Sequence, residues 1–149
     1  MADATDIGIL LALAYQRFVD ELRAALAAEG VDDQGRSDGY VLRAVAAGPV
    51  TVSELAERLA VSKQGAGQIV DDMVRRGYLE RYPDPDDGRA RLLRLAPYGR
   101  DVLAAARRFH RGYERRLRRT HGADAVAAFR TMLETIAGAD AETIRAMHV

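Results

Sequence analysis

The stretch that decides the fold is Thr51–Arg76, TVSELAERLAVSKQGAGQIVDDMVRR. Thr51 and Glu54 have the spacing of a capping box, in which a hydroxyl and a carboxylate each accept a hydrogen bond from a free backbone N–H group at a helix start. Ser62 offers a second N-cap. The stretch therefore predicts one short helix over about 52–60 and, after a tight turn, a second that continues to its end. This order is typical of a helix-turn-helix.

The residues that follow predict a β-hairpin. Residues 78–82 and 90–95 have the alternating character of strands, and the turn-forming sequence Pro83–Gly88, PDPDDG, lies between them. Pro97 suits the first turn of a long helix over about 97–119. A hairpin directly after a helix-turn-helix is the layout of a winged helix-turn-helix. In that layout the second helix can lie in the major groove of DNA, and the hairpin can reach the adjacent minor groove.

Further helices are predicted on both sides of this part. Apolar residues at three- and four-residue steps indicate helices over about 6–29 and 124–137, a short helix ending near Gly48, and last turns around Ile144 and Met147. The chain has 149 residues, of which 48% are apolar and 30% are charged, an ordinary composition for one globular domain. We expect a mostly α-helical α+β fold.

Basic residues gather in the middle of the chain, although the net charge of the whole is zero. Residues 58–119 carry 16 Lys or Arg against 8 Asp or Glu, which is a net charge of +8. Residues 1–57 carry a net charge of −6, and residues 120–149 carry −2. A basic middle between acidic ends indicates a phosphate-binding surface on part of the molecule, with a solvated basic face as the alternative.

Several kinds of chemistry have no support in the residues. The chain has no cysteine, which excludes disulfides, thiolate metal sites and cysteine nucleophiles. The histidines, His110, His121 and His148, have no metal-ligand spacing, and no frame of catalytic residues is recognisable. No apolar run approaches the roughly 20 residues of a membrane span, and the N-terminus lacks the pattern of a signal peptide. We expect a cytoplasmic protein that is not an enzyme, needs no cofactor or metal, and does not contact a membrane.

Three runs of residues, Gly48–Lys63, Ile69–Arg81 and Asp84–Gly99, together resemble the MarR family of bacterial transcription regulators. The third run contains an Asp-Pro-x-Asp-x-Arg wing. The resemblance is close over about 38–110 and extends to the flanking helices in length and placement. It implies a homodimer whose N- and C-terminal helices interlock and whose winged parts bind a pseudo-palindrome. The whole chain, 1–149, is then a single MarR-like domain, with dimerisation helices in 1–36 and 100–149 and the DNA-binding part in 37–99.

Two groups of residues are candidates for DNA contact. In the second helix of the motif, Gln64 and Gln68 lie opposite the apolar face, and a glutamine can bind adenine through two hydrogen bonds in the major groove. In the wing, the family pattern implies that Asp87 holds the side chain of Arg89, which enters the minor groove. The alternatives are solvated helix residues and a surface ion pair of little energy. The full candidate set is Ser62, Lys63, Gln64, Gln68, Arg75, Asp87, Arg89 and Arg91.

Three departures from the family pattern concern this site. Gly65 and Gly67 each weaken the second helix by about 1 kcal/mol relative to alanine, and Ala66 is smaller than the usual apolar residue. Either the helix backbone approaches DNA closely, or this helix is partly frayed in the free protein. Ala96 stands where the family commonly has a threonine N-cap, a cap typically worth about 1 kcal/mol.

The resemblance also implies an effector. Family members often release DNA when a small phenolic or anionic molecule binds between the dimerisation helices and the winged part. Arg111 is a further candidate cation for an anionic effector, and the alternative for the aromatic residues is the core. The candidate ligand-binding residues are Tyr15, Phe18, Tyr40, Arg43, Phe109 and Tyr113.

The function that fits these observations is a sequence-specific, DNA-binding transcriptional repressor that a small molecule releases from its operator. Its partners are double-stranded DNA and a second copy of the chain. The alternative is a winged-helix dimer that acts mainly through protein–protein contacts, its recognition helix weakened by the glycines. A steep dependence of duplex binding on salt separates the two hypotheses, since only DNA binding neutralises many phosphates.

Overall fold

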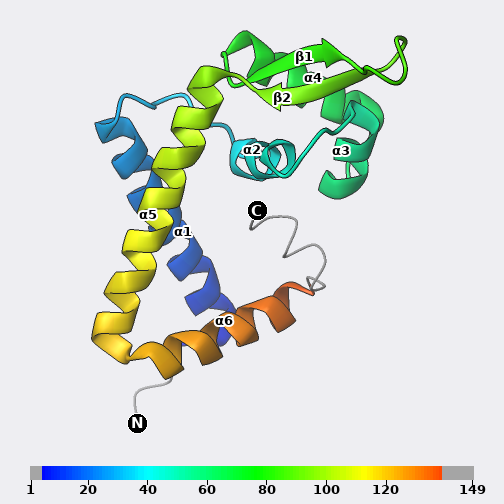
Figure 1. Ribbon diagram of the computed structural model, residues 1–149. Coiled ribbons are helices and arrows are strands. Elements are labelled where there is room, and N and C mark those ends of the chain that lie inside the picture. Colours follow the sequence, from blue (N-terminus) through cyan, green and yellow to red (C-terminus); the bar gives the residue numbers. More distant parts are fainter. Residues whose placement is uncertain (1–4, 139–149) are drawn as a thin grey trace. The chain divides into compact units, whose positions relative to one another are not determined.

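The computed structural model describes residues 5–138, and its elements follow the predicted order (Figure 1). The predicted helices and strands are confirmed to within about two residues at each end, the usual uncertainty of an element boundary. The turns expected around Ile144 and Met147 lie outside the described residues. The elements are α1 (Ile7–Ala28), α2 (Asp38–Ala46), α3 (Val52–Leu59), α4 (Lys63–Arg75), β1 (Leu79–Pro83), β2 (Arg91–Leu95), α5 (Pro97–His121) and α6 (Ala123–Ala137).

The chain forms two compact units, which divide between Gln34 and Gly35. The first unit contains α1 and the loop after it. This helix ends at Ala28, two residues before the predicted stop at Gly30, where a φ of +87° lets the chain turn back. The N–H of Val31 then donates to the carbonyl of Leu26 at 2.9 Å.

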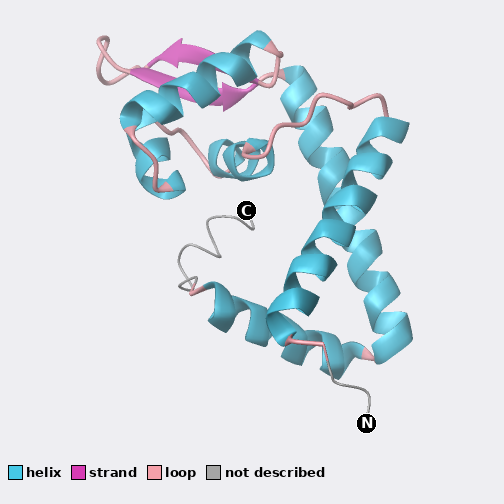
Figure 2. Ribbon diagram, turned by 180° about the vertical axis from the view of Figure 1, so that it is seen from behind, coloured by secondary structure: helices cyan, strands magenta, loops and turns pink. Residues whose placement is uncertain are grey.

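The second unit contains the winged helix-turn-helix. Helix α3 packs on α4, α4 contacts β1, and α2 contacts both β2 and α5. Figure 2 shows α4 running along one face of the hairpin. Apolar side chains from all these elements meet in one core, so that the recognition helix and the wing are held by the same packing. The most buried residues of this unit are Val41, Leu42, Val50, Leu55, Ala66, Val70, Met73, Tyr78, Leu79, Leu93 and Val102.

Helices α3 and α4 begin as the sequence predicts. The Thr51 hydroxyl accepts a hydrogen bond from the Glu54 N–H at 3.2 Å, and a Glu54 carboxylate oxygen accepts one from the Thr51 N–H at 2.8 Å. The Ser62 hydroxyl accepts one from the Gly65 N–H at 3.0 Å. Ala60, between the two helices, has a φ of +53°, a left-handed conformation that makes the tight turn. These local bonds determine where the recognition helix begins.

The hairpin is a two-stranded antiparallel sheet in which Leu79 pairs with Leu95 and Pro83 with Arg91. The middle of β2 is joined to the segment before α3, because the N–H of Leu93 donates to the carbonyl of Val50 at 2.9 Å. The wing is therefore a short ribbon that is anchored to the core as far as the middle of its second strand.

A buried ion pair joins the start of α2 to the end of α4. Asp38 is 2% exposed, and its two carboxylate oxygens accept hydrogen bonds from the guanidinium of Arg76 at 2.8 and 2.9 Å. The N–H of Gly35 donates to the same carboxylate at 2.6 Å. The hydrogen bond to Asp38 is the largest cause of the raised pKa of Arg76, to which Asp72 also contributes. Nothing in the sequence pattern indicated this pair.

Helix α5 starts against the residue that precedes β1. The N–H of Ala96 donates to the carbonyl of Tyr78 at 3.0 Å, and a Cβ on Gly99 would lie only 2.0 Å from that carbonyl oxygen. Ala96 occupies the N-cap position without a side-chain hydrogen bond, in agreement with the predicted loss of a cap. At the other end of α5, Gly122 has a φ of +88°, and α6 starts immediately after it (Figure 1).

Among the helices of residues 5–138, none has an apolar segment long enough to cross a bilayer.

Candidate nucleic-acid interface

The face of α4 that points away from the core is polar. Gln64, Gln68, Asp71 and Arg75 are all exposed, and their spacing of three and four residues places them on one side of the helix. Within the described part of the chain, the side-chain amides of Gln64 and Gln68 have no hydrogen-bond partner. They are available to bases in a groove.

Acidic residues on α4 hold neighbouring arginines. Asp71 binds the guanidinium of Arg81 on β1. Asp72 binds Arg75 on its own helix. Arg75, a candidate DNA contact, is therefore already paired, whereas Lys63 at the start of α4 is exposed. Arg81 was not among the predicted residues, because its partner is ten residues away and only the fold brings the two together.

At the tip of the wing, the contact that Asp87 makes differs from the expected one with the side chain of Arg89. The Asp87 carboxylate accepts a hydrogen bond from the backbone N–H of Arg89 at 3.0 Å, and no ion pair joins their side chains within residues 5–138. A carboxylate two residues before an N–H group reaches it easily, as in an Asx turn. Asp84 makes the same contact with the N–H of Asp86, at 2.9 Å. The carboxylates therefore order the loop backbone, and the side chain of Arg89 remains exposed.

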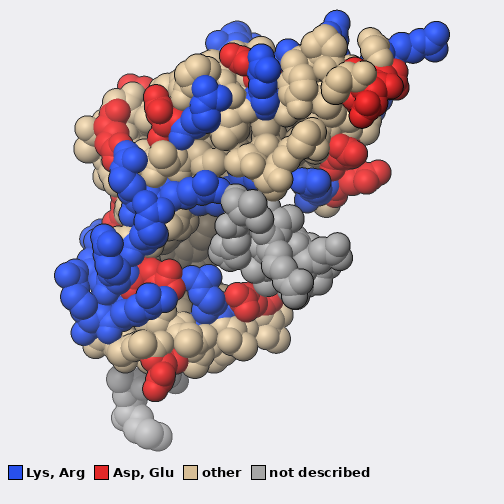
Figure 3. Space-filling model, viewed as in Figure 1, with Lys and Arg blue, Asp and Glu red and all other residues tan. Residues whose placement is uncertain are grey.

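Arginines also line the strands of the wing. Arg91 is exposed near the tip, opposite Pro83. Arg94 is bound to Glu80 on the opposite strand at 2.9 Å and lies over the ring of Tyr82. Figure 3 shows basic and acidic side chains side by side around the hairpin. Arg89 and Arg91 are thus the candidate cations of the wing.

The two glycines of α4 have different surroundings. A Cβ on Gly65 would lie 3.1 Å from the hydroxyl oxygen of Ser62, so a side chain there would press on the N-cap. A Cβ on Gly67 would have no heavy atom within 4 Å. The fold therefore does not need a glycine at position 67, and open space next to Gln64 remains on the exposed side of the helix.

The candidate ligand-binding residues lie on α1, α2 and α5. Tyr15 and Phe18 belong to α1, in the first unit, and Tyr15 is exposed. Tyr40, on α2, is also exposed, whereas Arg43 is half-buried and donates a hydrogen bond to the carbonyl of Gly39 at 3.1 Å. Phe109 and Tyr113 are one helical turn apart on α5, with ring centroids 5.9 Å from each other.

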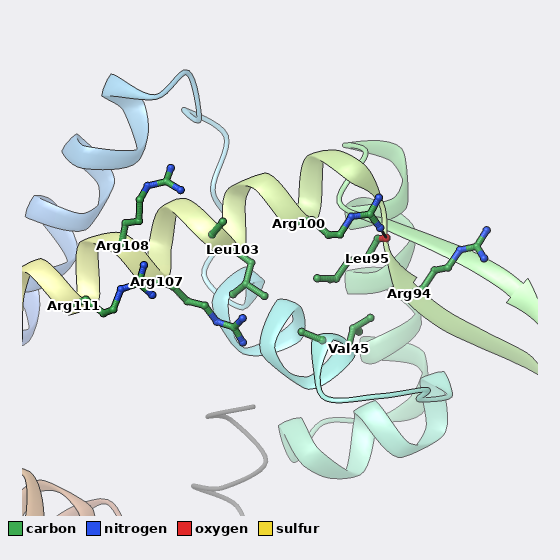
Figure 4. A pocket seen from close by; sticks show the side chains of 10 residues that line it. Val45, Arg94, Leu95, Arg100, Leu103, Arg107, Arg108 and Arg111 are labelled. Carbon is green, nitrogen blue, oxygen red and sulfur yellow. Dashed lines mark hydrogen bonds between the residues drawn. The ribbon is translucent and has the colours of Figure 1, made fainter.

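A groove of about 620 Å³ lies between α2, β2 and α5, and none of those six residues lines it. Figure 4 shows arginine side chains around it, from β2 and from successive turns of α5. Of the ligand candidates considered from sequence, only Arg111 lines this groove. The repeated arginines of α5 were a detectable signal, but only the fold places Arg94 beside them. The lining residues are Val45, Ala46, Arg94, Leu95, Arg100, Leu103, Ala104, Arg107, Arg108 and Arg111.

Burial and neighbouring positive charge lower the pKa of two half-buried groups, one on α5 and one on α2. Burial lowers the pKa of His110 to about 4, and the positive charge of Arg43 adds to the effect. Burial also lowers the pKa of Arg43, and the nearby Arg107 contributes. His110 is therefore neutral at pH 7. No cluster of three or more metal-binding side chains occurs among the residues that the structure describes.

A recognition helix with a polar outer face, a bracing helix and a basic hairpin define a winged helix-turn-helix protein. The family comparison is specific: residues 30–90 match the family model described as MarR family. The chain belongs to the MarR family of transcription regulators.

Known relatives agree with this assignment. The curated protein ExpG of Rhizobium meliloti (strain 1021), described as an exopolysaccharide II synthesis transcriptional activator, is 32% identical over 109 residues. The match covers 73% of this chain and 55% of ExpG, so the chain spans about half of that relative.

Solved structures have the same fold. The transcriptional repressor CouR, bound to a 23-mer DNA duplex, is 28% identical with a TM-score of 0.70, over 89% of this chain and 92% of that one. MarR from E. coli, complexed with operator DNA, is 24% identical with a TM-score of 0.67, over 87% of this chain and 92% of that one. BpsR of Bordetella bronchiseptica is 20% identical with a TM-score of 0.68, over 94% of this chain and 99% of that one.

Proposed function

We propose that the chain is a sequence-specific transcriptional repressor that binds a pseudo-palindromic operator as a homodimer. The observation that carries the proposal is the exposed polar face of α4 beside a wing with two exposed arginines, Arg89 and Arg91. Helix α4 is capped at Ser62 and packed on its apolar side, while Gln64 and Gln68 remain exposed. The similarity to CouR, a repressor bound to DNA, supports this function.

The recognition helix is suited to direct reading of bases. Gln64 and Gln68 lie near the helix N-terminus, which is the part of a recognition helix that reaches base edges in the major groove. The amide of a glutamine can donate to and accept from adenine simultaneously, so these two residues supply sequence preference. Ser62 and Lys63 contact phosphate through the start of the helix and the lysine ammonium.

The wing is suited to the minor groove. Asp87 and Asp84 hold the backbone of the tip, while Arg89 extends into solvent. A narrow minor groove has an enhanced negative potential that attracts an arginine. Arg91 lies on the strand behind the tip, in reach of the flanking phosphates.

The second copy is expected to cover the outer helices. Apolar side chains on α1 and α6 are exposed in the single chain, among them Ile7, Leu13, Met132 and Ile136. Two such helices leave more apolar surface in water than a monomer usually keeps. We therefore assign dimerisation to residues 1–36 and 100–149, and DNA binding to residues 37–99. A dimer places two copies of α4 in successive major grooves, which accounts for a pseudo-palindromic operator.

Regulation by a small molecule completes the proposal. BpsR is described by a mechanism in which 6-hydroxynicotinic acid regulates its DNA binding. We infer that this chain also has an effector and that it acts in the cytoplasm, where the operator is.

The experiment is a titration of the full-length protein into a labelled duplex that contains the DNA upstream of its own coding region. Binding is measured by fluorescence anisotropy at two salt concentrations, with and without excess random competitor. Tight binding that resists the competitor and weakens steeply with salt supports the proposal. Affinity equal to that for random DNA contradicts operator binding at this site and favours a role in protein–protein contacts.

Two variants test the residue assignments. Arg89→Ala should weaken duplex binding about tenfold, because it removes one charge-assisted contact. Gln68→Ala should change the preference between operator variants more than it changes the affinity for random DNA. The matched control is Arg58→Ala on α3, which removes one exposed arginine that is not among the candidate DNA contacts. If Arg89→Ala binds like the control, the wing assignment is wrong.

A further inference from the structure

The glycine at position 67 of the recognition helix is not required by the fold. Its φ is not in the left-handed region, and a Cβ there would have no heavy atom within 4 Å. Apart from proline, glycine is the least favourable residue inside a helix, so alanine at this position would make α4 more stable. A residue that lowers stability without serving the fold is expected where function needs it.

Gly65, the other glycine of α4, has a structural reason. A Cβ on Gly65 would lie 3.1 Å from the hydroxyl oxygen of Ser62, which caps the helix through the Gly65 N–H. A side chain there would therefore disturb the start of α4. Because only Gly67 is free of such a contact, its role has to be sought outside the packing of this chain.

Gly67 lies on one flank of the face that carries Gln64 and Gln68. An α-helix turns by about 100° per residue, so the two glutamines are about 40° apart, and Gly67 lies about 80° to one side of their midpoint. Gly65 lies about 80° to the other side by the same geometry. When the glutamines point to the floor of a groove, the two glycine positions point to its walls.

The width of a recognition helix limits how deeply it enters DNA. The major groove is about 12 Å wide. A helix with its side chains is about 10–12 Å in diameter, whereas its Cα atoms lie on a cylinder of only about 2.3 Å radius. Side chains on both flanks therefore nearly fill the groove. A turn with glycine on both flanks is narrower, so it lies nearer the bases before it meets the sugar–phosphate strands.

The narrow part of α4 is its N-terminal end, which is the part that contacts base edges in helix-turn-helix proteins. This end is a formed helix in spite of the glycines. The Ser62 hydroxyl caps it at 3.0 Å, and Ala66 and Val70 are fully buried beneath it. These contacts favour close approach of the backbone to DNA, and not fraying of the helix, as the reason for the glycine.

We propose that the missing side chain at position 67 lets the N-terminal turns of α4 enter the major groove deeply, and that Gly67 thereby determines how tightly and how specifically the operator is bound. This inference rests on the proposed function, because it requires the outer face of α4 to lie in the major groove. Gln64 and Gln68 then contact the bases from a backbone that lies close to them.

The test measures binding of the full-length protein to a duplex that the wild type selects from a random-sequence library. Affinities for this selected duplex and for a random duplex of equal length are measured by fluorescence anisotropy at one salt concentration. We expect Gly67→Ala to bind the selected duplex about tenfold more weakly than the wild type, the loss expected for one base contact. Its affinity for the random duplex should change less than about twofold, because non-specific binding depends on phosphate contacts. Equal or tighter binding of the selected duplex by Gly67→Ala would overturn the proposal.

A series of side-chain sizes separates the depth of insertion from the stability of the helix. Helix propensity decreases from alanine through valine to glycine, whereas side-chain size increases from glycine through alanine to valine. If depth decides, Gly67→Val binds the selected duplex still more weakly than Gly67→Ala. If Gly67→Ala binds most tightly of the three, helix stability decides and the proposal is wrong. Urea denaturation should show that neither variant is less stable than the wild type.

The matched control is Gly39→Ala on α2, which is in the winged part but not among the candidate DNA contacts. The nearest neighbour of the added Cβ would be a side-chain nitrogen of Arg43 at 3.4 Å. This control should bind both duplexes like the wild type. If it loses as much affinity for the selected duplex as Gly67→Ala does, the effect is not specific to the recognition helix and the proposal is refuted.

The same titrations distinguish failure of this inference from failure of the proposed function. If the wild type binds no selected duplex more tightly than random DNA, operator binding is refuted, and the role of Gly67 with it. If the wild type prefers its selected duplex and Gly67→Ala keeps the same affinity and preference, only the role of Gly67 is refuted. A loss in Gly67→Ala that is confined to the selected duplex supports both.

Discussion

Replacement of Gly99 by alanine should destabilise this protein far more than an ordinary glycine-to-alanine exchange. A Cβ on Gly99 would lie 2.0 Å from the carbonyl oxygen of Tyr78 and 2.9 Å from the carbonyl carbon. Side-chain carbons essentially never approach backbone atoms within 3.0 Å, so α5 would have to move by about 1 Å away from the base of the wing. Both partners are backbone, and neither can rotate away.

The magnitude follows from three contributions. Overpacking of this size costs about 3 kcal/mol, and loss of the buried hydrogen bond from Ala96 to Tyr78 costs about 1 kcal/mol more. Alanine in place of glycine within a helix stabilises the folded state by about 1 kcal/mol, which offsets part of this cost. The net expectation for Gly99→Ala is a decrease of about 3 kcal/mol in the free energy of unfolding.

The assay is urea denaturation at one fixed protein concentration, because the stability of a dimer depends on concentration. The matched control is Gly112→Ala in the same helix, where the added Cβ would have an arginine side-chain nitrogen at 3.9 Å as its nearest neighbour. The free energy of unfolding of this control should rise by about 1 kcal/mol. The steric argument is refuted if the two variants have the same stability, or if Gly99→Ala is as stable as the wild type.

Three further exchanges are predicted. Gly67→Ala should raise the free energy of unfolding by about 1 kcal/mol in urea denaturation, since its Cβ enters open space; a decrease would contradict this. Asp38→Ala should lower the free energy of unfolding by about 3 kcal/mol in the same assay, because Arg76 loses its buried partner. An unchanged denaturation midpoint would show that this ion pair does not stabilise the fold. His110, with a pKa of about 4 in the folded chain against 6.5 when unfolded, takes up its proton more readily in the unfolded state. The free energy of unfolding should therefore fall as pH decreases from 6.5 toward 4, by about 1–2 kcal/mol after allowance for the partial exposure of His110. In denaturation curves measured across this pH range, His110→Gln should make the free energy of unfolding depend less on pH.

The elements of the fold were predictable because their signals are local. The capping box at Thr51, the N-cap at Ser62 and the glycine after α1 act over three or four residues, so the sequence shows them directly. The exposed face of α4 was predictable for the same reason. A helical period of 3.6 residues assigns Gln64 and Gln68 to the side opposite Ala66 and Val70 without knowledge of any other element.

The contacts of the site were less predictable. The sequence placed Asp87 near Arg89, but the choice between a backbone N–H and a guanidinium as its partner depends on how the tip turns, and the structure selects the backbone. The role of the aromatic ligand candidates, none of which lines the groove between α2, β2 and α5, stays a prediction for a related reason. Helical spacing alone does not distinguish a ring that packs on its neighbour from one that lines a cavity.

The sequence by itself determined the order of helices and strands, the polar face of the recognition helix and the basic middle of the chain. Tertiary structure decided the rest, namely the pairing of Asp38 with Arg76, the binding of Arg81 by Asp71, and the assembly of Arg94 with the arginines of α5. The physical reason is range. Caps and periodicity act within a few residues, whereas ion pairs and grooves need side chains that are distant in sequence to meet, and only packing of the core brings them together.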